Sequence, residues 1–217
     1  MEKLQILYED NHLIAVYKPA GILVQGDISH EISLLDMVKD YIKKQYNKPG
    51  EVFLGLVHRL DRPVGGVVLF ARTSKSASRL SVQWRQRSLT KIYWALVHGK
   101  MPQPSGRLTS YLKKRRQKVS LTDETHKRAQ EAALTYSTLF VRGKVSLLEV
   151  HLHTGRKHQI RVQLAAEGCP IVGDRKYGAP DRREDGTICL VAKSLTFMHP
   201  TRPETMYIEA PAPDWAL

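Results

Sequence analysis

The sequence contains little cysteine and no long apolar run. Cys169 and Cys189 are its only cysteines, and they form no Cys-x-x-Cys pair, so a zinc or redox site has no support. Both thiols are expected to be reduced and buried. No apolar stretch approaches the roughly 18 residues that a membrane-spanning helix needs, and Met1–Asp10 lacks the pattern of a secretory signal peptide. We therefore expect a cytoplasmic protein.

Several nucleotide-binding and hydrolase motifs are also missing. The sequence has no Gly-x-x-x-x-Gly-Lys-Ser/Thr loop and no Gly-x-Gly-x-x-Gly run after a strand. These absences disfavour an enzyme that binds a nucleoside triphosphate or a dinucleotide cofactor. It also has no Gly-x-Ser-x-Gly elbow. His151 and His153 share one strand face, but no His-Glu-x-x-His pair occurs, and we expect no metal site. Any chemistry must therefore rest on Asp61 and on cations.

Acidic residues are fewer than basic ones. The 217 residues include 34 Lys and Arg against 21 Asp and Glu, a formal net charge of +13. Such an excess is typical of proteins that bind polyphosphates, so we expect nucleic acid as the partner and favour it over an anionic membrane. Residues 113–118 contain five cations in six positions, which indicates either a solvated charged loop or a contact to RNA backbone.

Hydrophobic periodicity predicts many short strands and few helices. Ser33 is expected to begin one helix, Thr73 or Ser74 a second that runs to about Arg87, and residues 157–167 a third. Apolar or alternating runs predict strands at residues 4–8, 13–17, 67–71, 91–97, 107–120 (two segments), 132–141, 144–153, 189–199 and 205–210. Because hairpin-like pairs dominate, we expect an α+β fold, with a mixed, mainly antiparallel β-sheet core and flanking helices. We expect a single domain over residues 1–217.

The most informative run is His58–Arg62, with the sequence His-Arg-Leu-Asp-Arg, followed by a Pro-Val-Gly-Gly turn. Asp61 stands among two arginines and a histidine, and opposite charges a few ångströms away favour its ionised form. An ionised, sequestered carboxylate can act as a nucleophile or as a base. A structural ion pair at a strand end is the alternative, and this run alone does not decide between the two.

Two further runs combine cations with hydrogen-bonding groups. Thr154–Arg161 places polar and basic side chains at the expected start of the third helix, where backbone N–H groups can bind an anion. Lys91 and Tyr93 point to the same face of a strand, so a base can stack on the ring while the ammonium holds a phosphate. A solvated helix end and an ordinary amphipathic strand are the alternatives.

Four motifs, in their order along the chain, resemble the RluA-type RNA pseudouridine synthases. They are Lys18–Gly21 (Lys-Pro-Ala-Gly), His58–Arg62, Lys91–Tyr93 and Gly155–Arg161, and residues 170–174 (Pro-Ile-Val-Gly-Asp) continue the likeness. The resemblance implies the pseudouridine synthase fold, an isomerase that converts uridine to pseudouridine within RNA, and no cofactor or metal. Pro63–Gly66 after the aspartate departs from the family pattern, as does Gln163, where a histidine is common.

The resemblance also implies a role for each of four residues. Asp61 matches the catalytic aspartate, and Arg59 matches the arginine that fills the gap left by the flipped-out uridine. Tyr93 matches the tyrosine that stacks on uracil, and Arg161 matches the arginine that pairs with the catalytic carboxylate. Attack of Asp61 on C1′ of the ribose and removal of a ribose proton by Asp61 both fit these residues.

Two alternative functions fit parts of the sequence. The first is an RNA-binding or chaperone protein with the same fold and no catalytic activity. The second, a glycoside hydrolase, is disfavoured because such enzymes usually need two carboxylates. The catalytic region already begins at Leu4, so we expect no S4-like domain before it and RNA selection by the domain's own loops, near residues 113–118 and 182–183. We expect ribosomal or transfer RNA as substrate, and a monomer without an obligatory protein partner.

Overall fold

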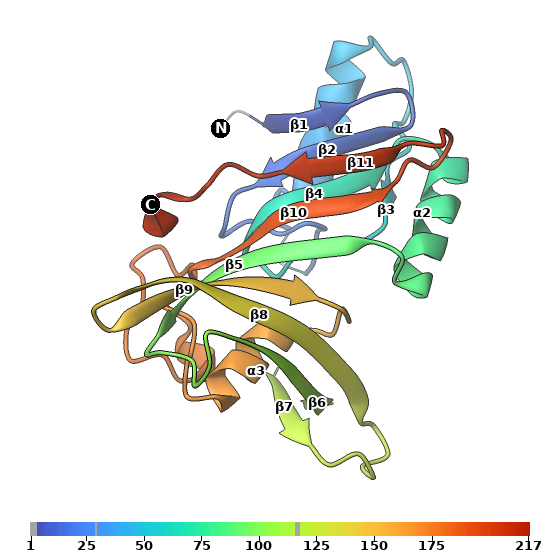
Figure 1. Ribbon diagram of the computed structural model, residues 1–217. Helices are drawn as coiled ribbons and strands as arrows, with labels where there is room; N and C mark the ends of the chain where they lie inside the picture. Colours follow the sequence, from blue (N-terminus) through green and yellow to red (C-terminus); the bar gives the residue numbers. More distant parts are fainter. Residues whose placement is uncertain (1–3, 29, 116–117) are drawn as a thin grey trace. The chain divides into compact units, whose positions relative to one another are not determined.

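The computed structural model describes residues 4–28, 30–115 and 118–217, so Arg116 and Gln117 of the basic run lie outside the described residues. The chain folds into two compact units (Figure 1). The first contains the described residues up to Leu89 together with Ala192–Pro211, and the second contains Thr90–Val191 and Ala212–Leu217. The chain therefore leaves the first unit after Leu89 and returns to it at Ala192.

The first unit is built on short strands that pair mainly antiparallel. Its strands are β1 (Gln5–Glu9), β2 (Leu13–Lys18), β3 (Gly55–Leu56), β4 (Gly65–Ala71), most of β10 (Leu190–Met198) and β11 (Thr205–Glu209). Their order is β1–β2–β4–β10, with β3 paired to β4 and β11 paired to β10. The β1–β2 hairpin follows from two apolar runs around a polar turn. β2 and β4 pair in unbroken register, which places Lys18 opposite Gly66.

Two capped helices belong to the first unit, α1 (Leu34–Gln45) and α2 (Ser74–Gln86). Ser33 begins α1 with a capping box, because its hydroxyl accepts from the Asp36 amide while the Asp36 carboxylate accepts from the Ser33 amide. Thr73 caps α2. Leu80 of α2 packs into the core cluster formed with β2, β4 and β10. Both helix starts confirm the sequence prediction.

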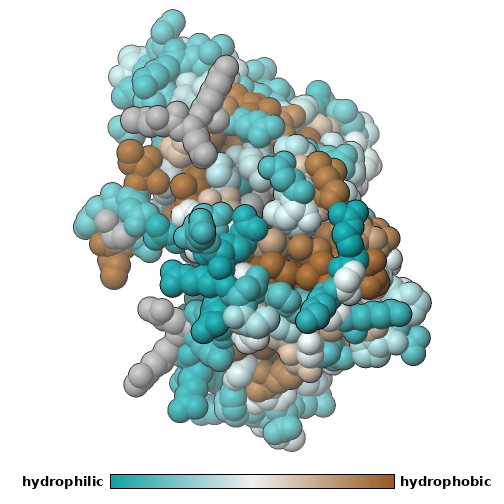
Figure 2. Space-filling view, turned by 90° about the vertical axis from the view of Figure 1, so that its left-hand side faces the viewer, coloured by the Kyte–Doolittle hydropathy of each residue, from teal (hydrophilic) through white to brown (hydrophobic). Residues whose placement is uncertain are grey.

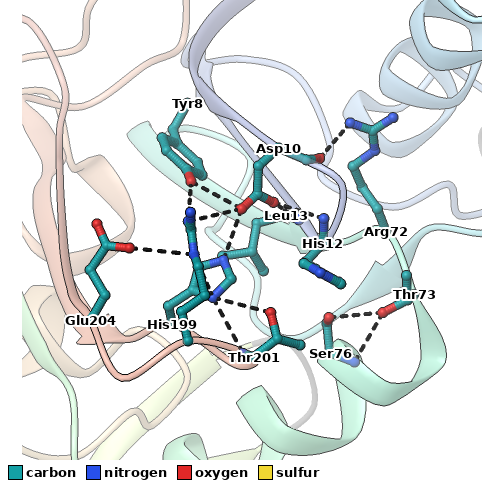
Figure 3. A network of polar contacts seen from close by, with 11 residues as sticks. Tyr8, Asp10, His12, Leu13, Arg72, Thr73, Ser76, His199, Thr201 and Glu204 are labelled. Carbon is teal, nitrogen blue, oxygen red and sulfur yellow. Dashed lines mark hydrogen bonds and ion pairs between the residues drawn. The ribbon is translucent and has the colours of Figure 1, made fainter.

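A polar network ties the β1–β2 turn to the segment that follows β10 (Figure 3). The Asp10 carboxylate accepts from the amides of His12 and Leu13, both at 2.7 Å, and from the buried imidazole of His199 at 2.9 Å. Burial disfavours the charged carboxylate, but these hydrogen bonds outweigh it, so the pKa of Asp10 is lowered. Asp10 therefore joins two segments that are far apart in the sequence.

The described part of the second unit contains an antiparallel sheet with a helix on one face. In spatial order, its strands are β5 (Thr90–His98), β9 (Val145–Leu152), β8 (Gln130–Arg142), β6 (Ser105–Arg115) and β7 (Lys118–Thr122). Val162 of α3 (Gln159–Ala166) packs against Leu112 and Ala132 of the sheet. Two short 3-10 turns also belong to this unit, η1 (Arg175–Tyr177) and η2 (Asp214–Ala216).

The structure confirms the predicted class, a mixed and mainly antiparallel α+β fold. The predicted start of the third helix at residue 157 is wrong, because α3 begins at Gln159. Gln159 Oε1 accepts from the Thr154 hydroxyl at 2.7 Å and from the Arg156 amide at 3.0 Å, so these bonds tie residues 154–156 to the first residue of α3. In the described part of the chain, no helix is both long enough and apolar enough to span a membrane.

Candidate active site

The Lys18–Gly21 turn and the loop that carries Asp61 lie side by side in the first unit. The Arg62 carbonyl accepts from the Gly21 amide at 2.8 Å and from Lys18 Nζ at 3.1 Å. In the other direction, Arg62 Nε donates to the Gly21 carbonyl at 2.8 Å. Two motifs that are far apart in the sequence therefore form one structural element next to Asp61.

Lys18 ends β2 and is fully buried. Its ammonium donates to three main-chain carbonyls, those of Pro19 at 3.0 Å, Ile22 at 2.8 Å and Arg62 at 3.1 Å. These three bonds match the three donors of an ammonium group. Burial lowers the pKa of Lys18 to about 7, and the negative charge of Asp61 opposes this shift. A buried cation thus lies within electrostatic reach of the candidate catalytic carboxylate.

Asp61 is half-buried on a tight turn directly before β4. Its carbonyl accepts from the amide of the buried Val64 at 3.0 Å, which closes the turn. Gly66 has a φ of +120°, and a Cβ at this position would lie 2.3 Å from the Ala192 carbonyl oxygen. Only glycine fits there. The turn and the start of β4 therefore determine where the chain presents Asp61.

His58 supports β4. Its Nε2 accepts from the Leu69 amide at 3.0 Å, which requires that nitrogen to carry no proton. Its ring stacks on Trp84 of α2, with ring centres 4.9 Å apart. His58 thus connects β4 with α2 next to the loop that carries Asp61.

The two arginines that flank Asp61 have different surroundings. Arg62 pairs with Glu31 at 2.7 Å and donates to the Lys18–Gly21 turn, so it is occupied in holding the loop together. Arg59 is exposed to solvent. Of these two side chains, Arg59 is the one whose position suits contact with a large ligand.

Tyr93 of β5 lies on the side of the second unit's sheet that α3 covers. Tyr93 pairs with Val150 of β9, and Val150 pairs with Tyr136 of β8, so the three side chains share one face. Tyr136 and Ala132 also share that face because side chains alternate along a strand. Ala132 packs in one cluster with Val162 of α3. The sheet register therefore places Tyr93 on the same side as α3.

Lys91 reaches the loop that precedes α3. Its Nζ lies 3.9 Å from the position that a Cβ on Gly155 would take. His158 stands directly before α3 with a φ of +53°, and its Nδ1 lies 2.7 Å from the Tyr177 hydroxyl. Arg156 and Lys157 precede the helix and do not belong to its first turn. The motifs at residues 91–93 and 155–161 are therefore neighbours in the second unit.

Arg161, buried on α3, forms a bidentate ion pair with Asp174. Nε lies 2.7 Å from Oδ2 and Nη2 lies 2.8 Å from Oδ1, and the two side chains are only 6% and 1% exposed. The guanidinium also lies over the ring of Tyr177, with Cζ 5.1 Å from its centre. Neither Asp174 nor Tyr177 is among the predicted site residues. The inclusion of Asp174 in the Pro-Ile-Val-Gly-Asp run is the signal that points to it.

Cys169 and Cys189 are both free and buried, which confirms the prediction for the two thiols. Burial raises the pKa of Cys189 to about 11, although the nearby Arg183 opposes the shift. Across residues 4–28, 30–115 and 118–217, no group of three or more His, Cys, Asp or Glu side chains lies close enough together to hold a metal ion.

A comparison with models of protein families shows which family the chain belongs to. Residues 12–166, more than half of its length, match the family model described as RNA pseudouridylate synthase. The chain belongs to this family of RNA isomerases. The matched range includes the motifs around Asp61, Tyr93 and Arg161, whereas Asp174 lies beyond it. The family resemblance inferred from the motifs is therefore confirmed.

Individual pseudouridine synthases are similar to nearly the whole chain. Ribosomal large subunit pseudouridine synthase C of Buchnera aphidicola subsp. Schizaphis graminum is 34% identical over 95% of this chain and 66% of its own length. An uncharacterized RNA pseudouridine synthase of Bacillus subtilis is 32% identical over 97% of this chain and 69% of its own length. The chain thus spans about two thirds of the length of these relatives.

The structure of Human RNA Pseudouridylate Synthase Domain Containing 4 matches this fold with a TM-score of 0.81 at 25% identity. The match covers 97% of this chain and 89% of that one. In this pseudouridine synthase fold, Arg59 and Asp61 belong to the first unit together with Lys18, while Tyr93 and Arg161 belong to the second.

Proposed function

We propose that this protein isomerises uridine to pseudouridine within RNA and that Asp61 is its catalytic residue. The observation that carries the proposal is the position of Asp61 on a closed turn whose next residue, Arg62, accepts a hydrogen bond from the buried Lys18, in a member of the pseudouridylate synthase family. An ionised carboxylate is what both attack on C1′ of the ribose and removal of a ribose proton require.

The other three predicted site residues act around the displaced base. The target uridine must leave its stack, which costs a few kcal/mol, and the exposed Arg59 fills the gap. Tyr93 stacks on the uracil and retains it while the glycosidic C–N bond breaks and the ribose bonds instead to C5. The proton on C5 is then lost to water, and N1 of the uracil, released from the ribose, takes up a proton. Arg161 pairs with the catalytic carboxylate and orients it.

The charge of the second unit supports RNA as the substrate. Its sequence contains 19 Lys and Arg against 10 Asp and Glu, so it contributes +9 of the net charge of +13. Arg115 and Lys118 stand opposite each other across β6 and β7, and such like charges destabilise a strand pair in the absence of a bound anion. Hydrophilic side chains also cover broad areas of the face in Figure 2. We assign contact with RNA phosphates to this hairpin.

We propose structured RNA, either ribosomal or transfer RNA, as the substrate. The name of the Buchnera relative, a ribosomal large subunit pseudouridine synthase, favours ribosomal RNA. We further propose that the two units work together as one catalytic domain, in a cytoplasmic monomer that needs no protein partner.

The decisive experiment compares Asp61→Asn with wild type on RNA that carries tritium at C5 of uridine. Asp61→Asn should release no tritium, while its RNA affinity stays near that of wild type. Asp40→Asn, which removes an exposed carboxylate paired with Lys44, is the matched control and should keep full activity. Tritium release by Asp61→Asn at the wild-type rate would show that Asp61 is not catalytic.

Mapping of pseudouridines across the transcriptome, in cells with and without the gene, identifies the substrate. A pseudouridine that disappears on deletion should return with the wild-type gene but not with Asp61→Asn. If no RNA gains pseudouridine although the protein binds RNA tightly and in a salt-dependent way, the chain is an RNA-binding protein without isomerase activity.

A further inference from the structure

The ion pair with Asp174 holds the guanidinium of Arg161 in one orientation. Asp174 occupies the Nε–Nη2 edge of the guanidinium through contacts at 2.7 and 2.8 Å. Two parallel hydrogen bonds between planar groups define both the distance and the common plane. A second carboxylate must therefore approach Arg161 from the side of Nη1.

The backbone around Asp174 is itself constrained. The Asp174 carbonyl accepts from the amides of Tyr177 at 3.0 Å and Ala179 at 3.1 Å. Gly173 has a φ of +86°, and a Cβ on it would lie 2.8 Å from the Thr187 carbonyl oxygen. Glycine is thus required directly before Asp174. The carboxylate that pairs with Arg161 therefore stands on a segment held by backbone hydrogen bonds and by a position that only glycine fits.

Tyr177 restrains the guanidinium from a second direction. The ring lies 5.1 Å from Arg161 Cζ, within the range of a cation–π contact. Its hydroxyl accepts from the Val119 amide of β7 at 3.1 Å and lies 2.7 Å from His158 Nδ1. Because the hydroxyl is bound on both sides, the ring is fixed. Tyr177 thereby connects α3 with the β6–β7 hairpin.

Stability alone is a weak reason for an ion pair buried this deeply. Removal of two charges from water costs about as much as their attraction returns, and apolar residues of similar volume often serve equally well. The pair is better explained by a use of the guanidinium itself. We propose that Asp174 is a positioning residue of the isomerase, which holds Arg161 in the orientation that the catalytic carboxylate requires. This inference rests on the proposed function, in which Arg161 pairs with Asp61.

The test measures the single-turnover rate and the KM for RNA in the full chain. Asp174→Asn preserves the shape of the side chain and removes its charge. We expect its rate to fall by about 100-fold, as displacement of a catalytic group by about 1 Å can cause, with little change in KM. The double variant Asp174→Asn/Arg161→Lys should be no slower than Arg161→Lys, because Asp174 acts only through Arg161.

Three further variants separate positioning from a structural role. Asp174→Glu restores the charge and should recover part of the rate, and Tyr177→Phe, which loses only the hydroxyl, should be a few-fold slower than wild type. Leu148→Val, a core change in the same unit, should lower the melting temperature and keep the rate. If Asp174→Asn does not fold, the rates and KM values of Asp174→Glu and Tyr177→Phe are compared with those of wild type instead.

Two outcomes would overturn different claims. The positioning role would be overturned if the wild-type enzyme is active and the variants of Asp174 and Tyr177 react within about twofold of its rate. It would also be overturned if their rates fall only as far as their lower melting temperatures predict. Wild-type protein without activity on any RNA would overturn the proposed function.

Discussion

The ammonium of Lys18 donates a hydrogen bond to the main-chain carbonyl oxygen of Arg62 at 3.1 Å. This contact joins the end of β2 to the loop that carries Asp61. Lys18 also holds the carbonyls of Pro19 and Ile22, and it is fully buried. Displacement of the loop would therefore leave a buried ammonium without one of its acceptors, which is costly.

Lys18→Met should destabilise the first unit. Methionine fills a similar volume but removes the ammonium donor from the carbonyls of Pro19 and Ile22, whereas the Arg62 carbonyl keeps the Gly21 amide. Each buried unsatisfied group costs about 1–3 kcal/mol. The variant no longer has to bury a charged ammonium group, and this gain offsets part of the destabilisation. We expect a net decrease of about 2 kcal/mol in the free energy of unfolding, measured with urea. Lys43→Met, an exposed position on α1, should have almost no effect. Equal stability of both variants would contradict the prediction.

The lowered pKa of Lys18 also predicts how stability depends on pH. Folded Lys18 titrates at about 7, against 10.5 when it is unperturbed. Between these values the unfolded state binds the extra proton, so the free energy of unfolding rises with pH, by at most about 1.4 kcal/mol per pH unit. Below about pH 7 both states are charged and the cost of burial is present in full. Urea unfolding of wild type and Lys18→Met should show this rise only in wild type.

Local sequence signals predicted the elements that local interactions build. Ser33 and Thr73 cap helices because their hydroxyls accept from amides three residues on, a pattern that is visible in the sequence. The start of α3 was not predictable in this way. Gln159 uses its side chain to hold residues 154–156, and helical periodicity contains no sign of these bonds.

In the candidate site, too, the sequence predicted individual residues but not the contacts between residues that are far apart along the chain. The order of the motifs predicted the family and drew attention to Asp61 and Arg161. It did not predict that Arg161 forms an ion pair with Asp174. Periodicity indicates which face of a helix is buried, whereas the matching carboxylate comes from a loop that folds back onto it. Lys18 is a similar case, because lysine is almost never fully buried and the sequence shows it only as part of a turn.

Asp10→Asn should destabilise the first unit at neutral pH and less so in acid. The carboxylate accepts from two amides and from His199, and hydrogen bonds to a charged group contribute about 1.5–3 kcal/mol. We expect a decrease of about 2 kcal/mol in the free energy of unfolding at neutral pH.

The acid dependence follows from the lowered pKa of folded Asp10. The contribution of the carboxylate is complete above its unperturbed pKa of 3.8 and is lost as the pH falls through the lower, folded value. Urea unfolding of both proteins at neutral pH and at a series of pH values from 3.8 downward measures the difference. A loss of the same size at all of these pH values would show that the charge of Asp10 is not what stabilises the turn.

Arg115→Gln should weaken RNA binding without destabilising the fold. Arg115 and Lys118 are exposed and directly opposite, so removal of one charge relieves a repulsion of roughly 0.2–1 kcal/mol. Loss of one phosphate contact should reduce the slope of log K against log salt concentration by about 0.7–0.9. Lys48→Gln, exposed in the first unit, should leave the slope unchanged. An unchanged slope in Arg115→Gln would mean that Arg115 makes no contact with the RNA backbone and that the basic end of the β6–β7 hairpin is simply solvated.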